Sequence, residues 1–420
     1  MTQRSKFILL TIGIVALCAA LVFYWQTPKH PSIPTQPELI PEPVETVILK
    51  PASFSELPGW STTQTLKSLE AFQLSCQRLI HLKPTRPVGN EWLPLQAKDW
   101  FRPCRAALKL KSPSEQKAKS FFETWFQPQT FVKEQPIVGL FTGYYAPQIA
   151  ASLQKTEAYP TPIYGVPKDL IVIKLNDFDP ALPARKLMGH IKHNRMKPYY
   201  SRAEIDQGAI KHTAPVIAYV RNPIDRLFLE IQGSGTLKFE DGSQANLGYA
   251  GKNGLSYTAI GRVLIRRGIL NSKTVSMQNI QKYLESHPAE RNNIINKNRS
   301  FVFFKTMTEE GAYGTQGAKL TPGYSLAVDP SWVPLGMPIW LNTTRPDSEL
   351  NTNHPLNRLM IAQDTGGAIK GTVRGDVFWG NDNQAAAIAG KMKNHGRYWL
   401  LTPKSRLAIT ETTKNHETHT

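Results

Sequence analysis

Hydrophobic residues recur at helical spacing in two stretches of the first third of the chain, residues 62–82 and 113–125. After residue 131 the pattern changes to short apolar runs separated by Gly, Pro and Asp, which is typical of β-strands. These runs are 136–145, 170–173, 215–220, 227–232 and 237–239. One more helix is expected over residues 257–267, before the last strands. The pattern predicts a mainly β protein with flanking helices (α+β), built around a β-barrel.

Two aspartates near the C-terminus stand beside predicted buried strands. The apolar run 359–362 precedes Asp364, and the apolar run 377–379 follows Asp376. Glycines at positions 366, 367, 371, 375 and 380 let the backbone turn sharply and let a bulky ligand approach the main chain. The two aspartates could simply cap turns, but the glycines also allow both carboxylates to face one cleft.

A shared cleft would give these carboxylates acid chemistry. Two neighbouring carboxylates raise the pKa of one of them, and burial beside Phe378 and Trp379 acts in the same direction. Arg374 and Lys370 act in the opposite direction. A carboxylic acid that stays protonated near neutral pH is what cleavage of a glycosidic bond requires, because the leaving oxygen must gain a proton.

The segment around these aspartates, residues 362–380, resembles the signature of the membrane-bound lytic murein transglycosylase A family. Further segments resemble blocks of that family in the same order: 141–147, 232–235, 249–254, 300–305 and 328–336. The resemblance extends from about residue 54 to about residue 401. It implies a double-psi β-barrel catalytic domain with a second β-domain inserted into it and a groove between the two. On this sequence the barrel would take residues 52–147 and 304–403, the insert residues 148–303, and a polar tail residues 404–420.

The resemblance also implies an activity. The family cleaves the β-1,4 bond between N-acetylmuramic acid and N-acetylglucosamine in peptidoglycan and forms a 1,6-anhydromuramoyl product without a cofactor. By its motifs, Asp376 would act as the acid and then the base, and Asp364 would support it. The implied substrate-binding residues are Thr142, Tyr144, Tyr145, Gln232, Ser234, Lys252, Asn253 and Lys370. Strand packing alone would also explain the two tyrosines.

Three other functions remain open from the sequence. A non-catalytic peptidoglycan-binding protein could use the same scaffold, and so could a hydrolase that leaves reducing ends. An aspartic-protease-like enzyme would use the Asp364-Thr365-Gly366 tripeptide, but such enzymes need two of these loops and the chain has one.

The charge of the chain points to a polyanionic partner. The 420 residues carry a formal net charge of +18, which fits nucleic acid, anionic lipid or an acidic polysaccharide wall and does not choose among them. Because no zinc finger, RNP motif or basic helical run is present, nucleic acid is disfavoured. Peptidoglycan glycan strands, whose stem peptides carry carboxylates, are the expected partner, and the family implies complexes of cell-wall synthesis or hydrolysis as further ones.

The N-terminus predicts export to the periplasm. Arg4 and Lys6 precede an uncharged run from Phe7 to Trp25, so residues 1–26 read as a signal or membrane anchor. Cys18 has the place of a lipoprotein cysteine, but Leu17 stands where a small residue is expected, so an uncleaved anchor is preferred to an outer-membrane lipoprotein. Residues 27–51 are rich in proline and predict an extended spacer.

The cysteines and histidines suggest no metal site, because none of them cluster at ligand spacing. Cys76 and Cys104 are the cysteines outside the anchor, and an oxidising periplasm would let them pair. Alternatively, Cys76 is a small core residue of an amphipathic helix.

Overall fold

The computed structural model describes residues 46–404 apart from 184, 273, 309–310 and 350–351. From Val47 onward these residues form one compact unit. The predicted anchor, the spacer up to residue 45 and the tail from residue 405 lie outside the described residues. None of the helices between residues 46 and 404 is long and apolar enough to span a bilayer.

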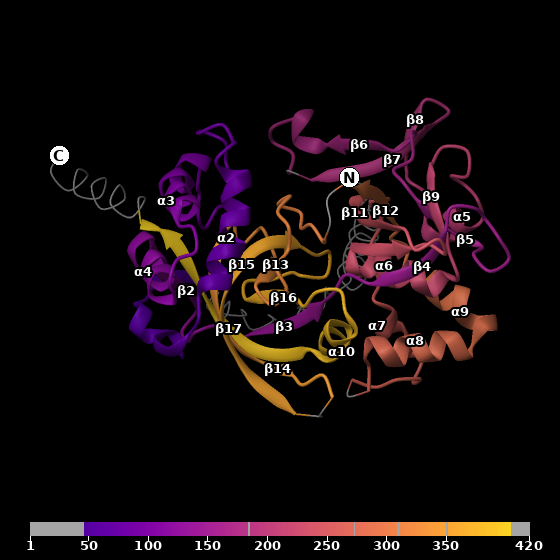
Figure 1. Ribbon diagram of the computed structural model, residues 1–420. Helices are drawn as coiled ribbons and strands as arrows, with labels where there is room; N and C mark the ends of the chain where they lie inside the picture. Colours follow the sequence, from indigo (N-terminus) through magenta and orange to yellow (C-terminus); the bar gives the residue numbers. More distant parts are fainter. Residues whose placement is uncertain (1–45, 184, 273, 309–310, 350–351, 405–420) are drawn as a thin grey trace, which may run out of the picture. The chain divides into compact units, whose positions relative to one another are not determined.

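A closed six-stranded β-barrel lies at the centre of this unit (Figure 1). Its strands follow the order β17, β14, β15, β13, β16 and β3, and β3 closes the ring because it pairs with both β16 and β17. Their bounds are β3 Gly139–Tyr144, β13 Ser325–Val328, β14 Pro338–Pro346, β15 Asn353–Thr365, β16 Arg374–Phe378 and β17 Lys393–Pro403. The predicted barrel is therefore confirmed.

Strands and helices from the beginning of the chain complete this part. β1 (Ile48–Pro51) pairs with β2 (Phe126–Val132), which continues the sheet beyond β17, so the last residues of the predicted spacer belong to the sheet. The helices are α2 Leu66–Leu79, α3 Ala97–Lys109, α4 Glu115–Trp125 and α10 Asn383–Lys391, with 3-10 turns at Phe54–Glu56 and Trp60–Thr62. α2 and α4 confirm the two helices predicted near the N-terminus.

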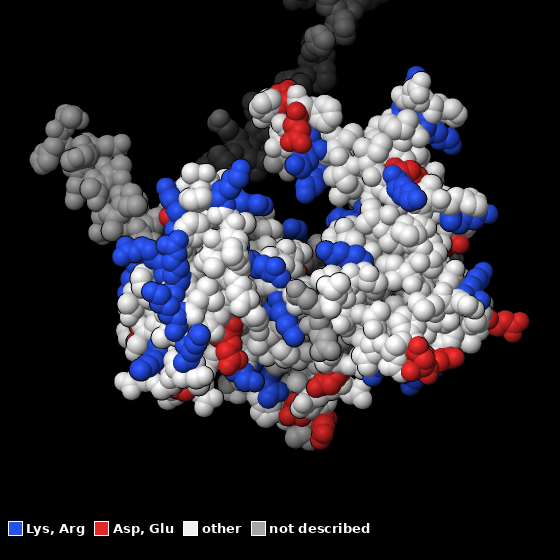
Figure 2. Space-filling model, turned by 45° about the horizontal axis from the view of Figure 1, so that its top comes forward, with Lys and Arg blue, Asp and Glu red and all other residues white. Residues whose placement is uncertain are grey.

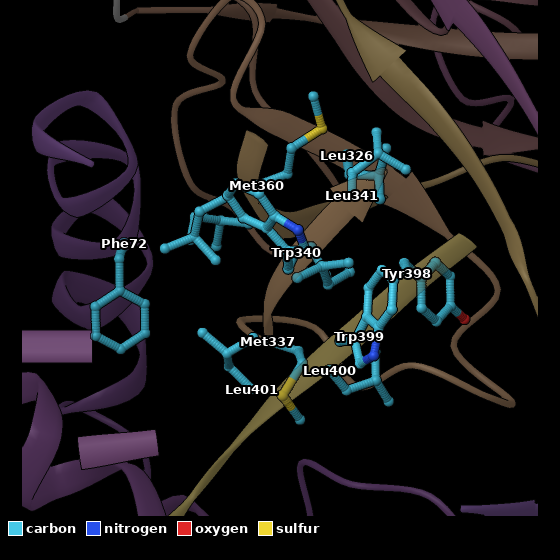
Figure 3. Close-up of a cluster of buried hydrophobic side chains, with 14 of the residues drawn as sticks. Phe72, Leu326, Met337, Trp340, Leu341, Met360, Tyr398, Trp399, Leu400 and Leu401 are labelled. Atoms are coloured by element: carbon cyan, nitrogen blue, oxygen red, sulfur yellow. The ribbon is translucent and has the colours of Figure 1, made fainter. Parts of the chain in front are cut away.

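One large hydrophobic core joins α2, α3 and α4 to the barrel. Phe72 of α2, Trp340 of β14 and Leu400 of β17 are fully buried in it (Figure 3). α2 is fixed to the barrel as well by the Ser68 hydroxyl, which donates to the Leu359 carbonyl at 2.8 Å. Each of these side chains supplies burial worth roughly 1.5–3 kcal/mol, so the helices and the barrel stabilise each other.

The middle of the chain forms a second, six-stranded sheet in the order β12-β11-β10-β4-β9-β5. Its strands are β4 Gln148–Ser152, β5 Thr161–Tyr164, β9 Val216–Val220, β10 Ser234–Lys238, β11 Gln244–Lys252 and β12 Val302–Met307. The helices of this region are α5 Arg202–Asp206, α6 Pro223–Gln232, α7 Ile260–Arg266, α8 Met277–Ser286 and α9 Pro288–Ile295. β4 to β12 thus occupy the stretch between the two halves of the barrel.

A small three-stranded sheet lies within the same stretch of the chain, drawn in magenta at the top of Figure 1. It consists of β6 (Ile171–Lys174), β7 (Lys186–Lys192) and β8 (Arg195–Pro198), and a 3-10 turn at Leu175–Asp177 follows β6.

One predicted strand is wrong. Residues 227–232 lie in helix α6. The capping signals at both ends of this segment favour a helix, although its apolar run by itself also fits a strand. The Asn222 side chain caps the helix by accepting from the amides of Ile224 and Asp225, Pro223 starts it, and Gly233 ends it with φ +77°. Asp225 lies in the first turn of this helix.

Cys76 of α2 and Cys104 of α3 form a disulfide, as an oxidising compartment would permit. Both residues are fully buried in the main core. The bond therefore joins the two helices at the layer that packs on the barrel.

Candidate active site

Asp364 and Asp376 lie in one row that crosses the barrel sheet. Ala327 of β13 is the register partner of Asp364 on β15 and of Asp376 on β16, and Asp376 is in turn the partner of Thr142 on β3. Partners in neighbouring strands carry their side chains on the same face of a sheet. The two carboxylates and the Thr142 hydroxyl therefore share one face, with only the small Ala327 side chain between the aspartates.

An irregularity in β15 brings Asp364 into this row. The register between β13 and β15 shifts after the pair Leu326 and Ala362, so that Ala327 pairs with Asp364 and skips Gln363. Without the shift, Gln363 would lie beside Ala327. Such bulges re-aim side chains near active sites. Gln363 is instead fully buried, where its amide donates to the Ala71 carbonyl at 2.9 Å.

Asp376 is half-buried and is held by one strong hydrogen bond. The Thr142 hydroxyl donates to Asp376 Oδ1 at 2.6 Å, and Arg374 Nη2 donates to the same Thr142 oxygen at 2.9 Å. Because the Arg374 hydrogen occupies a lone pair of Thr142, the Thr142 proton is directed to Asp376. Oδ2 of Asp376 has no such partner among the described side chains.

Asp364 is half-buried too and accepts three hydrogen bonds. Tyr144 Oη donates to Oδ2 at 2.9 Å, and the backbone amides of Thr315 and Thr365 donate to Oδ1 at 2.9 Å and 2.8 Å. Both oxygens of Asp364 are thus engaged within the protein, which suits a residue that holds geometry and charge.

Burial makes both carboxylates weaker acids than usual. A small cluster of buried residues includes Tyr144, which donates to Asp364, and Phe378, two positions after Asp376; its other members are Ala146, Ala312, Leu320 and Ala327. Desolvation by burial raises the pKa of Asp376 to about 6, and the charge of Asp364 adds to the rise, against the Thr142 hydrogen bond and the Arg374 charge. Desolvation also raises the pKa of Asp364, against its three hydrogen bonds. Asp376 can therefore hold a proton near neutral pH.

The structure brings some of the predicted substrate-binding residues to this site. Thr142 contacts Asp376 directly. Tyr144 is buried with 7% exposure, and its ring packs on Phe378 with centroids 5.3 Å apart, so it serves Asp364 rather than presenting a ring to a ligand. Tyr145 is half-buried, and its backbone amide donates to Gln232 Oε1 at 3.0 Å.

Asn253 is a correction to the prediction. Its side chain is fully buried, and Nδ2 donates to the carbonyls of Tyr200 and Arg299 at 2.8 Å and 2.9 Å. Oδ1 accepts from the amides of Phe301 and Leu255. Since all its hydrogen-bonding capacity is used by the backbone, Asn253 stabilises the loop after β11 and is not available to a substrate.

Two more predicted residues, Gln232 and Ser234, are largely buried. The Gln232 side chain bridges the Tyr145 amide and the Met277 sulfur, so it links the end of β3 to α8. Lys252, at the end of β11, is half-buried. Lys252 is therefore more accessible to a ligand than Gln232 or Ser234.

Lys370 lies in the turn between the two aspartate strands. Its ammonium is 3.3 Å from Asp329 Oδ1, while its side chain stays 63% exposed. Asp329 also accepts from the amides of Gly371 and Ser331 at 2.9 Å and 3.2 Å, so it fixes this turn. Lys370 is thus drawn to Asp329, whereas Arg374 is the cation linked to Asp376.

Two residues of the site, Arg374 and Thr315, are absent from the predicted catalytic and substrate-binding residues, although Arg374 was expected to lower the pKa of a carboxylate. The sequence contains a signal for Arg374, because it lies two residues before Asp376 on the same strand and so shares its face. No local signal exists for Thr315, which reaches Asp364 only through the fold.

Comparison with known protein families gives two matches. A family model described as the MltA specific insert domain matches residues 140–305, and one described as the 3D domain matches residues 324–402. The second match contains both aspartates. The first covers the stretch that holds the six-stranded sheet.

Individual relatives extend the similarity. The chain is 34% identical to the membrane-bound lytic murein transglycosylase A of Vibrio cholerae and 35% identical to that of Escherichia coli, over 62% of this chain and 65% of each relative. The alignment therefore spans somewhat less than two thirds of these relatives. A crystal structure of a membrane-bound lytic murein transglycosylase from Agrobacterium tumefaciens is 30% identical with a TM-score of 0.76, covering 87% of this chain and 99% of that one. MltA from Neisseria gonorrhoeae, in a monoclinic form, is 32% identical with a TM-score of 0.70, over 88% of this chain and 98% of that one.

Proposed function

Since the chain belongs to the membrane-bound lytic murein transglycosylase A family, we propose that it cleaves the β-1,4 bond between N-acetylmuramic acid and N-acetylglucosamine in peptidoglycan and leaves a 1,6-anhydromuramoyl end. The observation that carries this proposal is the pair of half-buried aspartates in one row of the barrel, of which Asp376 has a pKa raised to about 6. Asp364 has both oxygens occupied, so Asp376 is the residue assigned to proton transfer.

In the first step, Asp376 gives its proton to the glycosidic oxygen as the bond to the muramoyl C1 breaks. The proton leaves from Oδ2, because Oδ1 accepts the Thr142 hydrogen bond. That hydrogen bond, backed by Arg374, stabilises the carboxylate formed in this step. Desolvation raises the pKa of Asp376 to about 6 and the negative charge of Asp364 adds to this rise, so the protonated form that the first step requires predominates below that pH.

In the second step, the Asp376 carboxylate takes the proton of the muramoyl C6 hydroxyl while that oxygen bonds to C1. The carboxyl group is then restored to its starting form. Because the nucleophile belongs to the same sugar, its effective concentration is high, on the order of 10⁵ M or more in well-oriented cases. One carboxyl group is therefore sufficient, where a hydrolase needs a second one to activate water.

Thr142, Tyr145, Lys252 and Lys370 are the residues we assign to the vicinity of the glycan. Their hydroxyl and ammonium groups suit the acetamido and hydroxyl groups of a glycan and the carboxylates of stem peptides. The names of the relatives describe them as membrane-bound, and we propose the same for this chain, with the enzyme exported and held by the N-terminal segment. Cell-wall complexes remain further proposed partners.

Digestion of purified peptidoglycan by the full chain, followed by mass spectrometry, tests the activity. We expect soluble muropeptides with 1,6-anhydro ends, each lighter by one water than the hydrolytic product. Reducing ends would identify a hydrolase. Binding without release of muropeptides would identify a non-catalytic wall protein, and cleavage of peptides alone would favour the protease-like use of Asp364.

The pH dependence of the reaction gives an independent prediction. Asp376 must enter the reaction protonated, and its pKa is raised to about 6. We therefore expect kcat/KM to be highest below pH 6 and to fall about tenfold per pH unit above it. Muropeptide release measured from about pH 4 to about pH 8, a range centred on that pKa, checks this.

The Asp364→Asn variant provides the control for that profile. Asparagine keeps an oxygen that can accept a hydrogen bond but removes the charge that raises the pKa of Asp376. The alkaline limb should therefore move to lower pH. If activity fell at the same pH in this variant as in the wild type, the pH profile would not reflect the ionisation of Asp376 beside the charge of Asp364.

A further inference from the structure

The sheet of β6, β7 and β8 has two faces of opposite character. The register pairs Ile171 with Gly189, Gly189 with Pro198, Ile173 with Leu187, and Ile191 with Met196. Because paired and alternate residues share a face, one side of the sheet carries only apolar residues and a glycine: Ile171, Ile173, Leu187, Gly189, Ile191, Met196 and Pro198. The other side carries Lys174, Lys186, Lys192, Arg195 and Lys197 among its residues.

The middle of the second face rests on the rest of the unit, while Val172 on the same face stays 50% exposed. His190 stacks on Tyr200 with ring centroids 4.4 Å apart, and Met188 lies against Gly254, whose missing Cβ would come within 2.7 Å of it. The first face has no such cover. Ile191 is 57% exposed and Leu187 39%, and no residue of this face belongs to a hydrophobic cluster formed by the described residues.

The segment that joins β6 to β7 exposes two more large apolar side chains, the first of which stands between the exposed Asp177 and Asp179. Phe178 is 74% exposed and Leu182 42%. Leaving a row of aliphatic side chains and a phenyl ring in water is unfavourable, so such a surface marks an interaction site.

We infer that the apolar face of the β6–β8 sheet docks on an anionic phospholipid bilayer. The face has no hydrogen-bonding side chain, so it suits hydrocarbon and not a glycan. Lys186, Lys192 and Arg195 are exposed and stand at strand ends, with their side chains on the second face. Their long aliphatic stems let the charged groups reach around the ends of the sheet to the lipid phosphates beside the docked face. An apolar face edged by cations is the chemistry of a protein that lies in a membrane interface.

Helix α3 also has a basic surface, but it lacks exposed apolar side chains. Its exposed side carries Lys98, Arg102, Arg105 and Lys109, a basic helical face whose residues are not consecutive in the sequence. Basic side chains gather over the α3–α4 region in Figure 2. No strongly exposed large apolar residue lies on α3, however, so it lacks the second component that the β6–β8 sheet has.

The length of the chain before the described residues is compatible with docking. If residues 7–25 are the anchor, the stretch from Gln26 to Thr46 separates it from the unit that begins at Val47. Fully extended, this stretch reaches at most about 70 Å. The unit therefore stays within reach of the membrane that holds it, and docking of the sheet would fix its orientation there. This inference does not depend on the proposed catalytic activity.

The test uses the full chain with an environment-sensitive fluorescent amino acid in place of Ile191, reconstituted into vesicles with and without phosphatidylglycerol. In the anionic vesicles we expect a blue-shifted emission that nitroxide-bearing lipid tails quench. The triple variant K186Q/K192Q/R195Q should lose this quenching several-fold. The matched variant K98Q/R102Q/K109Q, which removes the same charges from α3, should keep it, and a fluorophore at the exposed Leu153 should not be quenched in any of the proteins.

Several results would overturn the inference. Absence of quenching at position 191 in anionic vesicles would exclude insertion of the sheet. If both triple variants lost quenching equally, net positive charge and not the β6–β8 sheet would account for membrane binding. A blue shift that appears in detergent and grows with protein concentration would assign the apolar face to contact with a second copy of the chain. Peptidoglycan digestion by the labelled protein remains a separate readout, so the enzymatic proposal and the docking inference can fail independently.

Discussion

Replacement of Asp376 by Asn is expected to reduce release of anhydro-muropeptides from purified peptidoglycan by at least roughly 10³-fold, because the only group assigned to proton transfer is removed. Asparagine has almost the same shape and keeps an oxygen for the Thr142 hydroxyl, which is 2.6 Å from Asp376 Oδ1. The loss should therefore come from the chemical step. Binding of the variant to peptidoglycan, measured by co-sedimentation, should be retained.

The stability of the same variant separates a chemical defect from a folding defect. The pKa of Asp376 is raised from 3.8 to about 6 in the folded protein, so the folded state binds the extra proton between these values. The wild type consequently loses stability as pH rises from about 4 to about 6, by at most about 3 kcal/mol. Asp376→Asn avoids this loss and should be at least as stable as the wild type at pH 7.5, as thermal unfolding at pH 4.5 and 7.5 would show.

Asp364→Asn is the contrasting variant for activity. It retains Asp376 as acid and base, so it should keep measurable turnover at low pH. If Asp376→Asn retained substantial activity while Asp364→Asn lost it, proton transfer would have to be reassigned to Asp364.

The second large effect is expected from the disulfide between α2 and α3. Replacing Cys76 and Cys104 together by Ala should lower the free energy of unfolding by about 3–4 kcal/mol, because the bond closes a loop with a sequence separation of 28 residues and its loss frees the unfolded chain. Both sulfurs also lie in the core that α2 and α3 share with the barrel. Denaturant unfolding followed by circular dichroism measures the difference.

Two controls accompany the disulfide variant. Cys18→Ala removes the remaining cysteine of the sequence and should leave the unfolding transition unchanged. The wild type measured with a reductant that opens the bond should approach the double variant. If the double variant unfolded at the wild-type denaturant concentration, the disulfide would not contribute to stability.

On its own, the sequence determined those helices and strands whose pattern of apolar residues is visible within a single segment. Helical spacing gave α2 and α4, and the apolar runs on either side of Asp364 and Asp376 gave the strands β15 and β16. Ordered motifs gave the family and the barrel. Helix α3 was not predicted, since Pro103 in its middle is a residue that ordinarily disfavours a helix interior. Residues 227–232 were mistaken for a strand because a short apolar run fits both a strand and a buried helix face.

The tertiary structure alone decided how the aspartates act. Their common row depends on pairing β15, β13, β16 and β3, which come from both ends of the chain, and on one shift of register that replaces Gln363 by Asp364. The burial that raises the pKa of Asp376 exists only in the folded barrel, and the Thr315 amide that donates to Asp364 comes from a residue 49 positions away. A sequence shows which residues can carry charge, whereas the acidity of each depends on the atoms that the fold places around it.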